Sequence, residues 1–370
     1  MKMRITYSFF LMAVMIIAII EFPHLPLHVV TMGLRLMMIF ILAIEMILSF
    51  KYCLSFFKPP ELVKNMGLCV VSVIFTLLLL EAFFMFLPRT HGIGYSLANA
   101  LWFDRYWKPF NSYGTRDLEP VKNKKTNIIF AGDSFAAGQG IKYIEDRFPD
   151  IVRTNLSKIN ENIQVINLAQ TSLDTKSEFD SVKNFIESSG IHPDIIILQY
   201  YGNDIDHIAK KFGMRGDGEG FSPYAELNAF TRWILRGSYL FNYLYWMIPS
   251  QEVNGYLTYI EKAYADDLIF TEHMNEIVAF NSYAKARNTK FFVVLFPLML
   301  EIELSHKLYL DKITRYLKSK DIESMDLSVL FKDLPISDRI VNGNDAHPSL
   351  AVHRLVGEEL TRYLSQELSK

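Results

Sequence analysis

Four short polar blocks in the second half of the chain contain the residue types that acyl transfer at a serine requires. The blocks are Gly132-Asp133-Ser134, Asn167-Leu168-Ala169-Gln170-Thr171-Ser172, Gly202-Asn203-Asp204 and Asp345-Ala346-His347-Pro348. A serine hydroxyl becomes a nucleophile when an imidazole takes its proton and a carboxylate fixes the imidazole tautomer. Amide groups can then stabilise the negative charge that develops on the attacked carbonyl oxygen.

Each of these roles has a candidate residue. We expect Ser134 to be the nucleophile, His347 the base and Asp345 the carboxylate that orients it. The expected oxyanion donors are the backbone N–H groups of Ser134 and around Ser172, together with the side-chain amide of Asn203. The residues that could do this chemistry therefore come from four distant parts of the chain.

The pattern of elements explains how these blocks would meet. Apolar runs predict strands at 127–131, 163–168, 194–200 and 290–296, and a short fifth strand is expected at 323–327. Helical spacing predicts helices at 177–188, 266–287, 306–318 and 350–368. Strands that alternate with helices predict an α/β fold, a parallel sheet with helices on both faces. The carboxyl ends of parallel strands share one edge, so the first three blocks converge there. The fourth precedes the last helix and can fold back over that edge.

In this order the blocks resemble the SGNH (GDSL-type) hydrolase family, over residues 127–370 without 206–265. The resemblance implies a three-layer α/β/α fold with a flavodoxin-like sheet and esterase or acyl-transfer chemistry. It also implies that Ser134 is the nucleophile, Asn203 an oxyanion donor and His347 the base.

The chain departs from the family pattern at two places. Ser172 stands where the family usually has a glycine, and Ala169 replaces another; a positive φ at Ser172 would cost free energy. In the fourth block the family often places Asp three residues before His, where this chain has Asn344. Asp345 is only two residues before, so a Ser-His dyad oriented by a backbone carbonyl is an alternative to the triad.

Other polar residues suggest structural roles. We expect Asp133 to accept hydrogen bonds from loop N–H groups and Asp204 and Asp206 to cap loops. His192, His207, His273 and His353 have no partner at metal-ligand spacing, and the glycine-rich stretch 213–220 lacks the Lys-Ser/Thr of a phosphate-binding loop. We therefore expect no metal and no cofactor.

The first third of the chain is apolar and predicts membrane-spanning helices at about 5–20, 27–50 and 66–86. Lys2 and Arg4 precede the first run, and Lys51, Lys58 and Lys64 separate the second from the third. By the positive-inside rule, three spans place everything after residue 87 outside the cytoplasm; two spans would reverse this. We expect an integral protein of the inner or plasma membrane, with lipid around these helices.

Charged residues occur within the predicted spans. Arg35 and Glu45 lie in the second and Glu81 near the outer end of the third. Such charges are expensive in lipid and can mark function. The alternatives are that Arg35 and Glu45 reach opposite interfaces or pair with neighbouring helices.

The expected domains are a membrane region at 1–87, an aromatic connector at 88–125 and a catalytic domain at 126–370 with an insertion at about 206–265. The insertion is aromatic between residues 232 and 248. It fits either a substrate-shaping lid or an amphipathic helix packed on the body or the membrane.

Composition narrows the function further. Half of the 370 residues are hydrophobic and the net charge is −2, which argues against a nucleic-acid partner. Cys53 and Cys69 are the only cysteines, so there is no disulfide framework and either redox compartment is tolerated.

Together these features favour a membrane-anchored serine esterase acting on O-acyl esters, O-acetyl first, of cell-envelope glycans or exopolysaccharide. The alternatives are an O-acyltransferase, a lipid esterase or thioesterase, or a non-catalytic subunit of a membrane polysaccharide-modifying assembly that binds a membrane-protein partner.

Overall fold

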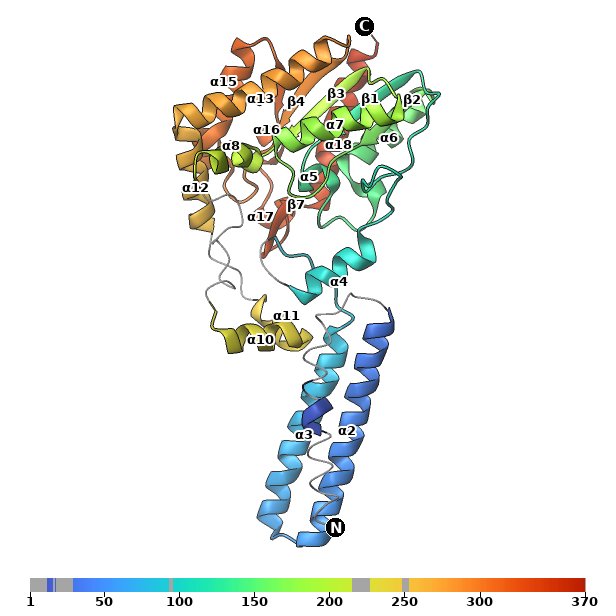
Figure 1. Cartoon of the computed structure of the whole chain (residues 1–370), viewed down its shortest axis with the longest axis vertical. Coiled ribbons are helices and arrows are strands. Elements are labelled where there is room, and N and C mark those ends of the chain that lie inside the picture. The colour runs from blue at the N-terminus through green and yellow to red at the C-terminus, as the bar shows by residue number, and fades with distance from the viewer. Residues whose placement is uncertain are drawn as a thin grey trace. The chain divides into compact units, whose positions relative to one another are not determined.

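The chain forms two compact units (Figure 1). The computed structural model describes residues 12–15, 17, 29–92, 96–214, 227–247 and 253–369. The helical unit comprises Met1–Arg105 and Pro223–Ser250, and the α/β unit comprises Tyr106–Ser222 and Gln251–Lys370. The backbone therefore passes between the two units three times.

The α/β unit is built on one five-stranded parallel sheet with the order β2-β1-β3-β4-β5. Its strands are β1 (Thr126–Ala131), β2 (Ile163–Asn167), β3 (Ile195–Tyr200), β4 (Lys290–Leu295) and β5 (Glu323–Asp326). Each overlaps a predicted strand and all four pairings are parallel, so the expected parallel sheet is confirmed. In register, Phe130 is opposite Asn167 and Ala131 is opposite Leu198, so the central strands end at one edge.

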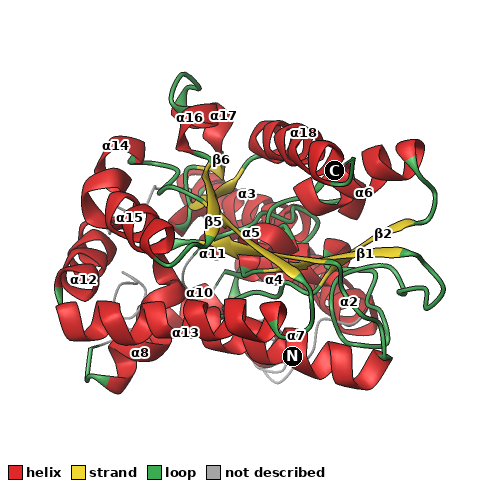
Figure 2. Ribbon diagram, turned by 90° about the horizontal axis from the view of Figure 1, so that it is seen from above, coloured by secondary structure: helices red, strands yellow, loops and turns green. Residues whose placement is uncertain are grey.

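Helices cover both faces of this sheet (Figure 2). On one face lie α6 (Phe148–Ile159) and α18 (Leu350–Glu367), and on the other α7 (Thr175–Ser189) and α13 (Asp267–Lys285). Side chains alternate across a strand, so Ile128 and Phe130 of β1 join the first core while Ile129 and Ala131 join the second. The expected three-layer α/β/α arrangement is thus the observed one.

Shorter elements complete the described part of the α/β unit. They are α5 (Ser134–Ala137), η2 (Ile144–Asp146), η3 (Gly202–Ile205), α8 (Asp206–Lys211), α12 (Val253–Ala265), α14 (Ile302–Ser305), the π-helical turn η4 (His306–Leu310), α15 (Asp311–Ser319), α16 (Ser328–Phe331), α17 (Ile336–Arg339), β6 (Ile340–Asn342) and β7 (Asp345–Pro348). β6 and β7 pair as an antiparallel hairpin immediately before α18.

Among its described residues, the helical unit contains two helices long and apolar enough to cross a bilayer, α2 (Val29–Phe57) and α3 (Glu61–Phe84). They correspond to the predicted second and third spans, although α2 continues past residue 50 and α3 begins before residue 66. The predicted first span lies outside the described residues except for helical positions 12–15 and 17. Arg35 of α2 forms an ion pair with Glu81 of α3. For Arg35, this is the expected alternative of pairing with a neighbouring helix.

The aromatic part of the insertion packs within the helical unit. Its helices are α10 (Ala229–Gly237) and α11 (Tyr239–Tyr245), which lie near α4 (Leu97–Tyr106). The Asn242 amide donates to the Leu235 carbonyl and accepts from the Leu97 N–H group, both at 2.9 Å. The described residues of this segment therefore form helices that pack within the helical unit.

A neutral histidine joins α6 to α18. His353 is fully buried, its Nδ1 accepts a 3.1 Å hydrogen bond from the Phe148 N–H group, and the two rings stack with centroids 5.5 Å apart. Burial, and then the positive charges of Arg147 and Arg116, lower the pKa of His353 to about 3. The ring therefore stays uncharged across the physiological range.

His353→Asn should reduce the acid sensitivity of the fold. Between pH 6.5 and about 3 the unfolded chain binds a proton at this position that the folded chain does not. His353 should therefore make the free energy of unfolding fall, as pH decreases, by at most about 1.4 kcal/mol per pH unit. The Asn carbonyl can still accept from Phe148 but cannot titrate. Denaturant unfolding from pH 7 to pH 4 should show that the difference in unfolding free energy between wild type and variant shrinks. A constant difference would contradict the lowered pKa of His353. His192→Asn, at an exposed position, is the control.

Candidate active site

Ser134 lies just past the carboxyl end of β1, at the start of the short helix α5. The turn between strand and helix is tight, because a Cβ at Gly132 would lie 2.5 Å from the Gln199 side-chain oxygen. Asp133 caps the helix through a 2.8 Å hydrogen bond from the Phe135 N–H group, the structural role expected for it. Ser134 itself is 9% exposed, so its hydroxyl lies at the base of the site with limited access to water.

Gln199 holds this turn from the neighbouring strand. Its side-chain oxygen accepts hydrogen bonds from the Asp133 and Ala136 N–H groups, at 3.1 and 3.0 Å. Gln199 is fully buried in β3. Sequence reasoning missed this residue, although a polar side chain in the apolar run Ile-Ile-Ile-Leu-Gln-Tyr was a usable signal.

The second polar block, which follows β2, is hydrogen-bonded to the turn that carries Ser134. Asn167, at the end of β2, donates through its amide to the Ala136 carbonyl at 2.8 Å. Beyond it, the Gln170 N–H group donates to the Gly132 carbonyl at 3.2 Å. The loops after β2 and β1 are therefore hydrogen-bonded to each other.

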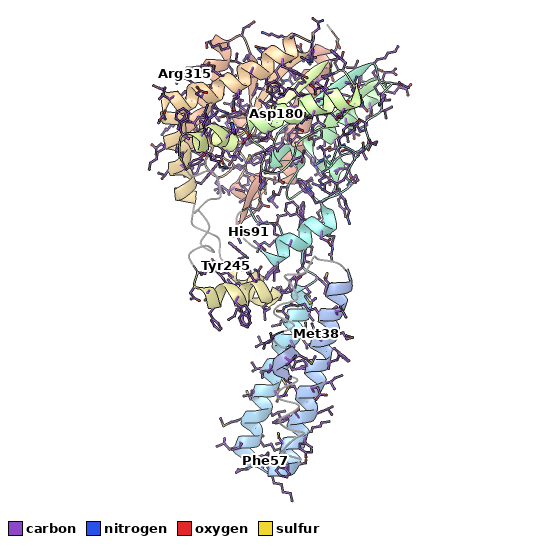
Figure 3. The ribbon with its side chains drawn as sticks, in the orientation of Figure 1. Met38, Phe57, His91, Asp180, Tyr245 and Arg315 are labelled. Carbon is purple, nitrogen blue, oxygen red and sulfur yellow. The ribbon has the colours of Figure 1, made fainter. Side chains whose placement is uncertain are left out.

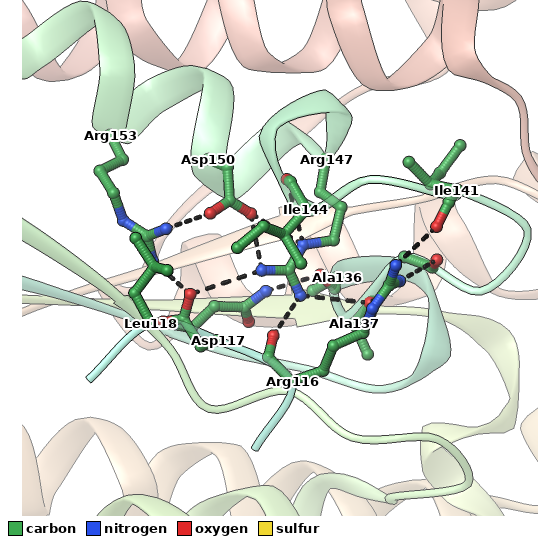
Figure 4. Close-up of polar contacts among 12 residues, drawn as sticks. Arg116, Asp117, Leu118, Ala136, Ala137, Ile141, Ile144, Arg147, Asp150 and Arg153 are labelled. Carbon is green, nitrogen blue, oxygen red and sulfur yellow. Dashed lines mark hydrogen bonds and ion pairs between the residues drawn. The ribbon is translucent and has the colours of Figure 1, made fainter. Parts of the chain in front are cut away.

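Two buried arginines bind the carbonyl groups behind Ser134 (Figure 4). Arg116 donates to the carbonyls of Gly138 and Ile141, each at 2.8 Å, and Arg147 donates to the Arg116 carbonyl at 2.6 Å. Burial, and then the nearby Arg147 charge, lowers the pKa of Arg116 to about 9. These contacts fix the exit of the α5 turn.

Acidic side chains neutralise this pair of arginines. Arg147 lies 2.7 Å from Asp150 and 3.4 Å from Asp117, and Arg153 contacts both carboxylates (Figure 4). All except Arg153 are at most 3% exposed. Arg147, Asp150 and Arg153 are spaced by three at the start of α6, but no sequence signal marked their contact with Arg116 and Asp117 of the connector.

His347 reaches Ser134 from the β6–β7 hairpin. Its Nε2 lies 2.7 Å from the Ser134 hydroxyl oxygen, and its Nδ1 is hydrogen-bonded to the Asp345 carboxylate. A carboxylate can only accept, so Nδ1 carries the hydrogen and Nε2 is left to accept from the serine hydroxyl. Ser134, His347 and Asp345, which the sequence selected as one group, are thus brought together.

The two-residue separation of Asp345 and His347 fits the strand that carries them. Both lie in β7, where residues i and i+2 point to the same side. Asp345 also accepts a 3.2 Å hydrogen bond from the His347 N–H group. Asn344, which stands at the family's usual acid position, lies in the turn and donates its N–H to Asn342.

The expected oxyanion donors lie in the segments that follow the strands flanking β1. Ser172 follows β2 and has a left-handed backbone, φ 63°, although it is not a glycine. Asn203 follows β3 within η3. Since the strand order is β2-β1-β3, these segments follow the two strands that flank the strand leading to Ser134.

Three buried carboxyl groups lie beneath the turn. Burial raises the pKa of Asp133, whereas the Phe135 N–H group, His347 and the amides of Gln199 and Asn203 oppose the shift. Burial, and then repulsion by Asp133, raises the pKa of Glu178 well above its ordinary range; burial, and then repulsion by Glu178, does the same for the pKa of Asp204. Glu178 projects from α7 and is 1% exposed. Sequence reasoning missed it, because a Glu in an amphipathic helix is usually solvent-facing.

Within the described residues, no group of three or more His, Cys, Asp or Glu side chains could hold a metal ion.

Comparison with known proteins yields similarity at the level of structure. No protein-family model matches the chain, and no curated protein matches it. Among solved structures, a protein of the G-D-S-L lipolytic family from Desulfitobacterium hafniense DCB-2 is 14% identical, with a TM-score of 0.39, over 64% of this chain and 99% of that one. The esterase EstA from Pseudoalteromonas sp. is 12% identical, with a TM-score of 0.40, over 66% of this chain and all of that one.

An acetylxylan esterase from Geobacillus stearothermophilus is 10% identical, with a TM-score of 0.39, over 65% of this chain and 95% of that one. At these identities the likeness concerns the α/β/α fold.

Replacing Ser172 by glycine tests the cost of its left-handed backbone. The variant keeps the N–H group and loses only an exposed side chain. Relief of the positive φ, offset by the greater freedom of glycine in the unfolded chain, should change the free energy of unfolding by less than about 1 kcal/mol. Ester hydrolysis should be retained. A large loss of activity would show that the serine side chain, and not the N–H group, is what the site uses.

Glu178→Gln should make the stability of the fold less dependent on pH. Because the pKa of folded Glu178 lies above that of the unfolded chain, the folded state holds an extra proton from about pH 4.5 upward, and stability falls as pH rises through the folded pKa. Gln carries no such proton. Denaturant unfolding from pH 5 to pH 9 should show the variant gaining on wild type as pH rises, unlike the exposed control Glu187→Gln. Parallel curves would contradict the shift.

Proposed function

We propose that the protein is a membrane-anchored serine esterase acting on O-acyl esters of cell-envelope glycans or exopolysaccharide. The observation that carries the proposal is the alignment of the Ser134 hydroxyl, the His347 imidazole and the Asp345 carboxylate. Support for the anchor comes from α2 and α3, which have the length and composition of spans.

The first half-reaction forms an acyl-enzyme. Ser134 Oγ attacks the ester carbonyl carbon while its proton moves to His347 Nε2. Asp345 stabilises the resulting imidazolium through Nδ1–H. The carbonyl oxygen becomes an oxyanion, for which the N–H groups of Ser134 and Ser172 and the amide of Asn203 are the proposed donors. Collapse expels the alkoxide, which takes the proton from Nε2 and leaves as the deacylated hydroxyl.

The second half-reaction releases the acyl group. A water molecule attacks the acyl carbon, His347 Nε2 takes its proton, and the same donors stabilise the second oxyanion. Ser134 then leaves with the proton returned from Nε2, and the acid is released. A sugar hydroxyl in place of water would give the O-acyltransferase outcome through identical steps.

The substrate class rests on the expected placement of the α/β unit outside the cytoplasm. O-acylated glycans are abundant esters of that side, and hydrolysis of their short acyl groups needs no deep acyl-chain channel. A preference for long acyl chains would instead favour a lipid esterase or thioesterase.

Labelling with a fluorophosphonate probe tests the proposed nucleophile and base. The wild-type protein in membranes should be labelled and should hydrolyse an aryl acetate, whereas Ser134→Ala and His347→Ala should lose both. Asp345→Asn should keep its fold and lose about 10²–10⁴ in turnover, since the imidazole loses the acceptor that fixes its tautomer. Ser157→Ala, at an exposed serine of α6, is the matched control.

Two outcomes would contradict the proposal. Absence of labelling in a folded wild-type protein would favour a non-catalytic subunit, and labelling that persists in Ser134→Ala would assign the reactive serine elsewhere. For a labelled protein, release of acetate from O-acetylated polysaccharide, with and without a soluble sugar acceptor, separates hydrolysis from transfer.

A further inference from the structure

A polar cluster in the helical unit binds the insertion helices to the α2–α3 hairpin. Arg35 of α2 and Glu81 of α3 form an ion pair at 2.5 Å and are 2% and 7% exposed. Arg35 also donates to the Gly237 carbonyl at the end of α10 and lies over the Tyr239 ring, 5.0 Å from its centroid. Both charges of the pair are therefore used to hold a segment that lies more than 150 residues further along the chain.

The Glu81 carboxylate receives the first residues of α11. One oxygen accepts from the Tyr239 N–H group at 2.9 Å, and the other accepts from the Ser238 hydroxyl at 2.7 Å and the Leu240 N–H group at 3.0 Å. Backbone N–H groups at a helix start have no partner within the helix. Glu81 supplies that partner, so α11 cannot leave the hairpin without exposing a buried charge and unpaired donors.

This cluster lies at one end of the predicted spans. Glu81 is twenty residues beyond Glu61, where α3 begins, and Arg35 is twenty-two residues before Phe57, where α2 ends. At 1.5 Å per residue these separations are about 30 and 33 Å, close to the thickness of a hydrocarbon core. Figure 3 shows Phe57 and Tyr245 at opposite ends of the hairpin.

The insertion helices lie across the axis of the hairpin, not along it (Figure 1). One side packs inward, with Leu235, Tyr239, Leu240 and Trp246 each at most 5% exposed. Their remaining surface carries large apolar side chains: Phe230 is 68% exposed, Phe241 46%, Leu244 44% and Met247 54%. Phe241 and Leu244 are three residues apart in α11, which places them on neighbouring parts of one face, and Met247 follows in the turn after the helix.

We propose that α10 and α11 form an interfacial helix pair whose exposed apolar side chains enter the lipid at the outer boundary of the spans. The proposal rests on the membrane anchor of the proposed function. Lipid is the occupant because α11 packs on α3, with the Tyr243 and Phe84 rings 4.6 Å apart, and α3 itself exposes apolar side chains such as Leu79, which is 55% exposed. The helix pair is held at the depth where a bilayer's hydrocarbon ends. Aromatic side chains are favoured at that depth, and amphipathic helices lie there in the membrane plane.

A lipid-bound helix pair gives the α/β unit a further attachment to the membrane. The helix pair is inserted between residues 222 and 251 of the α/β unit, so the chain leaves that unit for the membrane and returns. The α/β unit is then tied to the membrane at three points along its sequence. In this arrangement the aromatic part of the insertion is a membrane attachment of the chain and not a lid over the site.

Site-directed spin labelling of the full chain in lipid vesicles tests the proposal. In a background of Cys53→Ser and Cys69→Ser, single cysteines replace Phe241 and Leu244, with Leu79→Cys on α3 as the lipid reference and Tyr143→Cys, at a 57% exposed position of the α/β unit, as the water reference. Accessibility to oxygen, relative to a water-soluble nickel chelate, should be several-fold higher at 241 and 244 than at 143.

Three other results are informative. Water-like accessibility at 241 and 244, with lipid-like accessibility at 79, would overturn the proposal and leave the anchor intact. Low accessibility to both reagents would mean that protein covers the pair, which also overturns it. Water-like accessibility at 79 would instead show that the proposed anchor is wrong.

A second arm tests the cluster itself. Glu81→Ala should increase the mobility of the label at 241 several-fold, because α11 loses the acceptor for its first N–H groups, and Glu61→Ala at the other end of α3 should not. Glu81→Gln, which keeps one acceptor oxygen, should give an intermediate effect. Unchanged mobility in Glu81→Ala would contradict the role assigned to this residue.

Discussion

The site depends on a close approach between the backbone at Gly132 and the side chain of Gln199. Any side chain at position 132 would collide with the Gln199 oxygen, and without that oxygen the N–H groups of Asp133 and Ala136 would be buried without an acceptor. Leaving a buried donor unpaired costs about 1–3 kcal/mol. The turn that presents Ser134 is therefore set by the adjacent strand as well as by its own residues.

Opposite charges are buried on two sides of this turn. Arg116 and Arg147 bind carbonyl groups on its far side, and their charges are balanced by Asp117 and Asp150. Beneath it, Asp133, Asp204 and Glu178 repel one another in a region where burial already disfavours ionisation. The result is a polar interior around Ser134 that tolerates little rearrangement, because each charged group depends on the placement of others.

The helical unit uses buried charge in a similar way. Arg35 and Glu81 are hydrogen-bonded to each other, to the end of α10 and to the start of α11. These bonds to α10 and α11 offset the cost of burying the two charges. A charge in an apolar helix, which sequence alone marks as unusual, here acts as the attachment point for a segment that belongs in sequence to the α/β unit.

The sequence by itself determined the elements whose signals are local. Strand positions followed from apolar runs, the parallel sheet from the alternation of strands and helices, and the four polar blocks from their places at strand ends. The group Ser134, His347 and Asp345 could be selected because the order of elements limits which loops meet at one edge.

Only the tertiary structure decided the rest. Gln199, Arg116 and Glu178 lie against groups that are distant in sequence, and Arg147, besides its neighbour Asp150, binds the Arg116 carbonyl and Asp117 of the connector. The contact of Asp345 with His347 depended on β7 being a strand, since only there do residues two apart face the same side. The division of the insertion between two units could not be predicted either, because burial of α10 and α11 depends on a charge pair in helices more than 140 residues away.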